Sequence, residues 1–157
     1  IGWCDWSSDV CSSDLNCCLL SPDLYESFGF PILAGIFARH SPDPADMRGQ
    51  HSDSAMGHLL PILGRLGLTT VNFGPTVMVD DIRRHLPRAV IHGALAPFTY
   101  SRNEEVNMVA EFLRDFEMAR ERRGLVFATA GSINNGSRLT GMRLLMGAIQ
   151  RYGRYTQ

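Results

Sequence analysis

The sequence contains no lysine, since all 15 of its basic residues are arginines. A lysine Schiff base and a lysine general base are therefore excluded. The formal net charge is −1 without a clustered basic excess, so we expect no nucleic-acid partner. No apolar run approaches the roughly 20 residues of a membrane-spanning helix, so we expect no membrane partner either.

Cysteine is absent after residue 18, and the four cysteines are Cys4, Cys11, Cys17 and Cys18. Because the rest of the chain offers no distant partner, we expect neither a disulfide framework nor a metal knuckle. The adjacent pair Cys17-Cys18 is interpreted as two small buried apolar side chains. The first residues also lack the cationic start and apolar centre of a signal peptide, so the expected location is the cytoplasm.

Residues 1–15 differ from the rest of the chain. They hold both tryptophans and repeated Ser-Asp pairs, without a helical or alternating apolar period. The string resembles a translated sequencing adapter, and we interpret it as an artefactual or disordered segment that is left out of the fold prediction. Residues 16–157 then form the domain, which we expect to be truncated at Asn16.

From residue 47 onward, an apolar run followed by a helical pattern occurs four times. The runs are residues 47–51, 69–73, 89–93 and 125–129. Alternating strands and helices predict an α/β fold with parallel strands and crossover helices. Four such units are half of a TIM-type (β/α)8 barrel, and a doubly wound open sheet is the competing fold. The chain has no glycine-rich phosphate loop that would indicate nucleotide binding.

Capping signals predict where the helices lie. Ser21-Pro22 starts the first helix, which Pro31 should kink, and Gly67 ends a helix over about 55–66. Further helices are expected over 79–85, after a capping box at 101–104, and over about 139–152. The side chains expected to point inward on the first and last of these helices are Leu24, Tyr25, Phe28, Ile32, Ile36, Phe37, Leu139, Met142, Leu145, Met146 and Ile149. On the helix after the capping box they are Val106, Val109, Ala110, Leu113 and Phe116.

His51 and Asp53 are the sharpest functional candidates. They end the first run, at the strand end where parallel α/β folds place their chemistry. An imidazole and a carboxylate two residues apart can hold a metal ion, or act as a base and the group that orients it. In the alternative interpretation His51 satisfies backbone groups, while Asp53 or Ser54 caps the next helix.

The other strand ends supply weaker candidates. His92 can act as an acid or bind an anionic substrate, and Gly93 lets a ligand approach the backbone, although His92 can equally be a core histidine. Asn72 and Phe73 can provide an amide contact and an apolar wall, or simply end their strand. The remaining candidates are Arg102 as a carboxylate clamp, and Gly131 and Ser132 as part of an anion-binding loop. Their alternatives are a solvated loop residue and a connection in which Ser137 caps the last helix.

Five segments stand in a characteristic order along the chain. They are residues 21–25 (Ser-Pro-Asp-Leu-Tyr), 51–53, 59–67, 90–93 (Val-Ile-His-Gly) and 131–153. From Leu19 to Tyr155 this order resembles the C-terminal part of the uroporphyrinogen decarboxylase superfamily. The superfamily contains the haem-pathway decarboxylase and cobamide-dependent methyltransferases. The resemblance implies the C-terminal half of a TIM-type barrel.

The two branches of this superfamily imply different sites. The methyltransferases hold zinc with a His-x-Cys pair and a later cysteine; His51 matches the histidine, Asp53 replaces the first cysteine, and Gly131 stands at or near the second. The decarboxylase has a histidine in the last loop, again replaced around Gly131, and uses arginines and an aspartate from the N-terminal half.

The resemblance implies an enzyme, with His51, Asp53 and His92 as catalytic residues. The expected activity is corrinoid-linked methyl transfer on a small methylated compound, with His51 and Asp53 as metal ligands for zinc and the corrinoid carried by a partner protein. The substrate contacts are expected from Asn72, Phe73, Gly93, Arg102, Gly131 and Ser132. The alternatives are a porphyrinogen carboxy-lyase without a cofactor and a non-catalytic tetrapyrrole-binding fragment. A homodimer is a further expectation.

Overall fold

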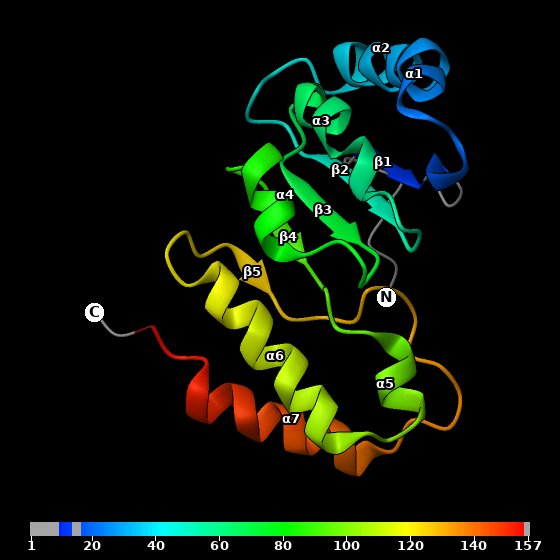
Figure 1. Ribbon diagram of the computed structural model, residues 1–157. Coiled ribbons are helices and arrows are strands. Elements are labelled where there is room, and N and C mark those ends of the chain that lie inside the picture. Colours follow the sequence, from blue (N-terminus) through cyan, green and yellow to red (C-terminus); the bar gives the residue numbers. More distant parts are fainter. Residues whose placement is uncertain (1–9, 14–16, 156–157) are drawn as a thin grey trace.

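A computed structural model describes residues 10–13 and 17–155. Its centre is a five-stranded sheet in which all neighbouring strands are parallel (Figure 1). The strands are β1 Val10–Ser13, β2 Arg48–Ser52, β3 Thr70–Phe73, β4 Val90–His92 and β5 Leu125–Val126. The four predicted strands are confirmed with somewhat different bounds. The fifth, β1, lies within residues 1–15, the segment that the sequence analysis interprets as artefactual or disordered.

The order of the strands across the sheet is the same as their order along the chain, β1-β2-β3-β4-β5. A doubly wound sheet reverses its strand order at a switch point, and these five strands have no such reversal. Crossovers of one hand between successive strands place their helices on the same face of the sheet. The arrangement is therefore α/β with a parallel sheet, compatible with half of a TIM-type barrel.

The helical segments follow the strands closely. They are η1 Cys17–Leu19, α1 Pro22–Leu24, η2 Tyr25–Gly29, α2 Phe30–His40, η3 Gly57–Leu59, α3 Leu60–Leu63, η4 Gly64–Leu66, α4 Val79–His85, α5 Pro97–Ser101, α6 Glu105–Ala119 and α7 Leu139–Tyr152. Within the described part of the chain, no helix is both long and apolar enough to cross a bilayer.

The first helix begins as predicted, because Ser21 caps it by accepting a hydrogen bond from the amide of Leu24. The disturbance expected at Pro31 takes the form of a π-helical turn, η2, in which the amide of Phe30 bonds back to the carbonyl of Tyr25. Proline has no amide hydrogen and its ring crowds the carbonyl four residues earlier, so a wider turn just before it relieves the clash.

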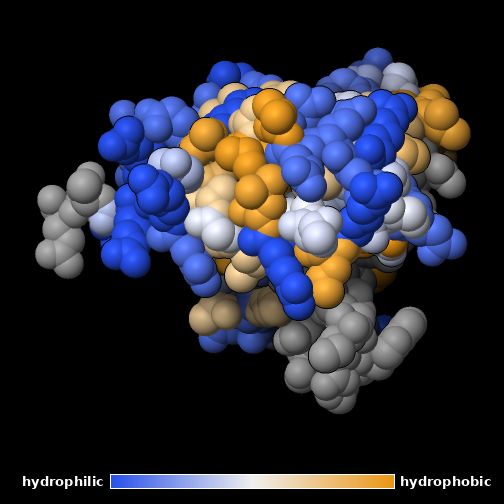
Figure 2. Space-filling view, turned by 90° about the horizontal axis from the view of Figure 1, so that it is seen from below, coloured by the Kyte–Doolittle hydropathy of each residue, from blue (hydrophilic) through white to orange (hydrophobic). Residues whose placement is uncertain are grey.

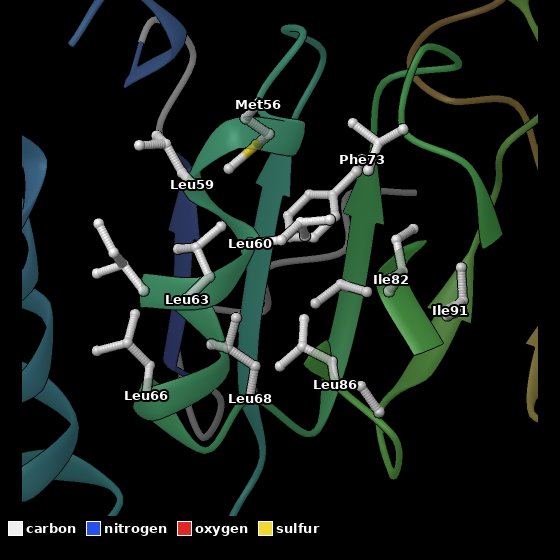
Figure 3. Close-up of a cluster of buried hydrophobic side chains, with 14 of the residues drawn as sticks. Met56, Leu59, Leu60, Leu63, Leu66, Leu68, Phe73, Ile82, Leu86 and Ile91 are labelled. Carbon is white, nitrogen blue, oxygen red and sulfur yellow. The ribbon is translucent and has the colours of Figure 1, made fainter. Parts of the chain in front are cut away.

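The main core lies between the helices and one face of the sheet. The region around α3 contributes Leu59, Leu60 and Leu63, and Leu60 lies beside Phe73 of β3 (Figure 3). Side chains of α2, α4 and α6 join the same cluster, so these helices cover the same face. Gly67 ends η4 in the left-handed conformation, with φ of 66°, as the sequence predicts.

A second cluster packs α5, α6 and α7 together beyond β5. It is built on Phe112, which lies edge-on to Phe127 with ring centroids 4.8 Å apart, and on Leu145 from α7. β5 is only two residues long, and the predicted strand over 125–129 continues as an isolated bridge between Leu95 and Thr129. The chain after β5 is thereby held beside the chain after β4.

Several helical side chains that are predicted to point inward are exposed in the structure. Tyr25, Phe37 and Leu145 are buried as expected. The prediction is wrong for side chains that are more than a third exposed: Leu24, Phe28, Ile32 and Ile36 of the first helix, Val106 and Leu113 of α6, and Leu139 and Met146 of α7. Ala110 is exposed as well. Figure 2 shows apolar residues gathered amid hydrophilic ones on the end of the molecule where α5 and α7 lie. These helices bury one side only, so an apolar stripe wider than that side reaches the surface.

The predicted capping box at 101–104 is also wrong. Ser101 ends α5, and α6 begins at Glu105 without a side-chain cap. Between them Asn103 takes a positive φ of 55°, which asparagine tolerates better than most residues. Its side chain accepts a hydrogen bond from the amide of Arg138, which is the N-cap residue of α7, so Ser137 does not cap that helix.

Candidate active site

Alternate residues of the central strands lie on opposite faces of the sheet. Val71 and Phe73 of β3 and Ile91 of β4 face the helices and belong to the main core. Residues between and beside them, Asn72 and His92, therefore lie on the other face. The register pairs His51 of β2 with Asn72, which puts His51 on that face as well.

His51 sits between two oxygen atoms. Its Nδ1 lies 2.7 Å from Oδ1 of Asn72, and its Nε2 lies 3.3 Å from Oδ1 of Asp53. The side chains of His51 and Asp53 are 31% and 52% exposed, so a molecule in solution can reach them. The pair sits at the carboxyl end of β2, at the edge of the sheet where parallel α/β folds bind ligands.

The amide of Asn72 on β3 contacts three other segments of the chain. Its Oδ1 faces His51, while its Nδ2 donates to the carbonyl of His92 at 2.7 Å and to that of Thr129 at 3.4 Å. These contacts reach from β3 to β2, to the end of β4 and to the segment after β5. The sequence predicts that Asn72 contacts substrate. In the structure, both ends of the Asn72 amide instead have hydrogen-bond partners within the protein.

Two of the candidate glycines stand where a side chain would be strained, because both have a positive φ. Gly131 has φ of +124°, and a Cβ there would lie 2.7 Å from Oδ1 of Asp53. Gly93 has φ of +107°, and a Cβ there would lie 2.8 Å from Nδ2 of Asn72. The loops after β4 and β5 therefore approach the polar groups closely because these positions lack side chains. The strand ends carrying His51, Asn72, Gly93 and Gly131 converge at one edge of the sheet.

Three candidates are not part of this group. Phe73 is 2% exposed and packs in the main core, on the opposite face of the sheet from His51. Arg102 lies in the connection between α5 and α6, with its side chain 70% exposed and 4.0 Å from Glu104. Ser132 is exposed, next to Gly131, and the described residues show no contact between its hydroxyl and the His51–Asp53 pair.

His92 is half-buried at the end of β4, and this burial lowers the pKa of its imidazole. A lowered pKa keeps the ring neutral at pH 7. His92 is thus suited to accept a proton or a hydrogen bond, and poorly suited to hold an anionic group by charge.

The alternative interpretation of Asp53 and Ser54 as helix caps does not match the local geometry. The next helical segment, η3, begins at Gly57, its N-cap residue is Met56, and no side chain caps it. The Asp53 carboxylate instead faces His51. Across residues 10–13 and 17–155, however, no three His, Cys, Asp or Glu side chains gather in a group that could hold a metal ion. Any ion at this position would have only two protein ligands from the described chain.

The role of Thr129 is not indicated by the sequence. Its carbonyl receives a hydrogen bond from Asn72 across 57 positions of sequence. The pairing of Leu95 with Thr129 helps to bring it there, and residue types do not show which backbone carbonyl accepts such a bond.

No known protein-family model matches this sequence, and no curated protein is significantly similar to it. The resemblance to the uroporphyrinogen decarboxylase superfamily therefore stays a prediction. It rests on the order of the five sequence segments, and it agrees with the parallel α/β arrangement.

Proposed function

We propose that this chain forms part of an enzyme of the uroporphyrinogen decarboxylase superfamily, with His51 and Asp53 at the reaction centre. The proposed reaction belongs to the methyltransferase-like branch: transfer of a methyl group from a small methylated compound, with the corrinoid on a partner protein. The observation that carries the proposal is the solvent-accessible imidazole–carboxylate pair, 3.3 Å apart, at the carboxyl end of a parallel strand.

The pair offers two of the three protein ligands that a catalytic zinc ion ordinarily uses. An imidazole nitrogen and a carboxylate oxygen are both ordinary zinc ligands. Asp53 replaces a thiolate with a harder donor, and a catalytic zinc site keeps a position for substrate or water beside its protein ligands. When bound, zinc would supply Lewis acidity that lowers the pKa of a coordinated thiol.

The chain's own residues would supply position and polarity. His51 and Asp53 would hold the cation, and Gly93 and Gly131 would let the loops after β4 and β5 lie close against Asn72 and Asp53. His92, kept neutral by the burial that lowers its pKa, would offer a hydrogen bond on the same face of the sheet.

The decarboxylase alternative has less support from the site. A porphyrinogen carries several carboxylates, whose binding calls for several cationic groups. Arg102, the arginine expected for this task, is 70% exposed and lies close to Glu104. A non-catalytic fragment, the other alternative, gives no reason for a histidine and an aspartate to be aligned at an accessible strand end.

Zinc analysis of the purified protein tests the proposal. We expect the wild-type chain to take up one equivalent of zinc, and His51→Ala and Asp53→Asn to lose it. His40→Ala is the matched control, because His40 is exposed at the end of α2 and should leave zinc uptake unchanged. Absence of zinc uptake by the wild-type protein, measured by titration and by elemental analysis, would contradict the methyltransferase-like assignment.

A further inference from the structure

The hydrogen bonds around Asn72 fix which way its amide points. The two ends of an asparagine amide differ in chemistry: the NH2 group donates and the oxygen accepts. On one side of Asn72 lie two backbone carbonyls, those of His92 and Thr129, which can only accept. The amide nitrogen must point toward them, because a rotated amide would set its oxygen against two other oxygens.

The orientation of Asn72 in turn decides the protonation of His51. With the nitrogen directed at the carbonyls, Oδ1 of Asn72 faces Nδ1 of His51 at 2.7 Å. An amide oxygen only accepts, so Nδ1 has to carry a hydrogen. In the neutral ring the other nitrogen, Nε2, then carries the lone pair.

That lone pair lies beside a second acceptor, since Oδ1 of Asp53 is 3.3 Å from Nε2. An imidazole lone pair and a carboxylate oxygen repel each other until something positive lies between them. The cation can be a proton on Nε2 or a metal ion held by both atoms.

We infer that Asn72 is a positioning residue that locks His51 in the Nδ1–H tautomer, so that Nε2 and Asp53 together present two electron-pair donors to a cation. This inference rests on the proposed function where it names a metal ion as the cation. It replaces the expectation that Asn72 contacts substrate. Metal-bound histidines characteristically donate their other ring hydrogen to an acceptor, and Asn72 supplies that acceptor here.

Nitrogen-15 NMR of the metal-free protein with labelled histidine tests the tautomer directly. At alkaline pH, where imidazole rings are neutral, we expect the hydrogen of His51 on Nδ1 and an unprotonated Nε2. In Asn72→Leu the acceptor is gone, and we expect the hydrogen to move to Nε2, where it can bond to Asp53. A wild-type His51 that already carries its hydrogen on Nε2 would overturn the inference, and this result needs no variant to fold.

Thr70→Val is the matched control. Thr70 stands two residues before Asn72 on the same face of β3, and this change should leave the His51 tautomer as it is in the wild type. We also expect Asn72→Leu to weaken zinc binding about 10–100-fold, as loss of a supporting hydrogen bond does at other metal sites. An unchanged tautomer in a folded Asn72→Leu protein would contradict the inference. Because the tautomer is measured without metal, a wild-type protein that binds no zinc would count against the proposed function and leave the tautomer result standing.

Discussion

The two faces of the sheet differ sharply although they are built from neighbouring residues of the same strands. On β3, Val71 and Phe73 pack under the helices with 1% and 2% of their surface exposed, while Asn72 between them belongs to the hydrogen-bonded group with His51. On β4, Ile91 is in the core and His92 is on the other face. Successive side chains of a strand point to opposite faces. A shift of one residue in register would therefore exchange the side chains of the core with those of the candidate site.

The helix-covered face departs from its apolar pattern at β2. Gln50 of β2 lies two residues from Ser52 on this face and is 2% exposed. Neither end of its amide has a hydrogen-bond partner within the described part of the chain. One face is therefore polar and satisfied around Asn72, and the other is apolar with one unsatisfied amide.

The largest expected effect comes from Phe73→Ala. The ring is fully enclosed in the main core, so removing it leaves a cavity and should lower the free energy of unfolding by about 3–5 kcal/mol. Chemical denaturation followed by circular dichroism measures this loss. An equal loss of stability in Asn72→Ala, one residue earlier, would contradict the assignment of the core to the helix-covered face alone.

Gly131→Ala should have the next largest effect. The residue has φ of +124°, which L side chains rarely adopt, and its new Cβ would overlap Asp53. We expect a loss of up to about 3 kcal/mol together with weakened zinc uptake, since the carboxylate has to move. Gly147→Ala in α7 is the control: a Cβ there meets nothing within 4 Å, and alanine in a helix should stabilise by about 0.5–1 kcal/mol. Equal effects of the two changes would contradict the close approach at Gly131.

Gln50→Met tests the helix-covered face of the sheet. Methionine matches the length of glutamine and has no amide to satisfy, so we expect the protein to gain about 1–2 kcal/mol of stability. Thermal unfolding measures the gain, with Gln150→Met near the end of α7 as an exposed control that should change little. A clear loss of stability would show that the Gln50 amide has a partner in solution.

The features that could be predicted from the sequence are those that depend on local pattern. Parallel strands, the start of the first helix at Ser21 and the left-handed Gly67 follow from apolar runs and capping residues close together in the chain. The sequence also predicts that His51, Asp53, Gly93 and Gly131 lie at or after the carboxyl ends of strands, and these ends lie close together because the parallel strands are neighbours.

The features that could not be predicted depend on distant partners. The face of Phe73 is set by register with β2, since a shift of one residue would have put it beside His51. Arg83 gives another example. Its guanidinium is buried and donates to the carbonyls of Ala89, Arg123 and Gly124, although its sequence context is that of a surface helix. Residue types alone do not reveal hydrogen bonds to backbone carbonyls 40 positions away.

The smallest expected effect is a pH dependence of the stability, which arises from His92 on the face of the sheet opposite the helices. Burial lowers the pKa of His92 below the ordinary value of 6.5, so the unfolded chain binds its proton more readily than the folded one does. The stability that His92 contributes is therefore present above pH 6.5 and declines as the pH falls through that value. Denaturation of the wild type between pH 8 and pH 5 should reveal this decline, and His92→Gln, which cannot take up the proton, should reduce it. His40→Ala should leave the pH dependence unchanged, since His40 is exposed at the end of α2. An equally steep decline in His92→Gln and in the wild type would show that another group is responsible. The imidazole of His92 would then be as well solvated as that of an ordinary surface histidine.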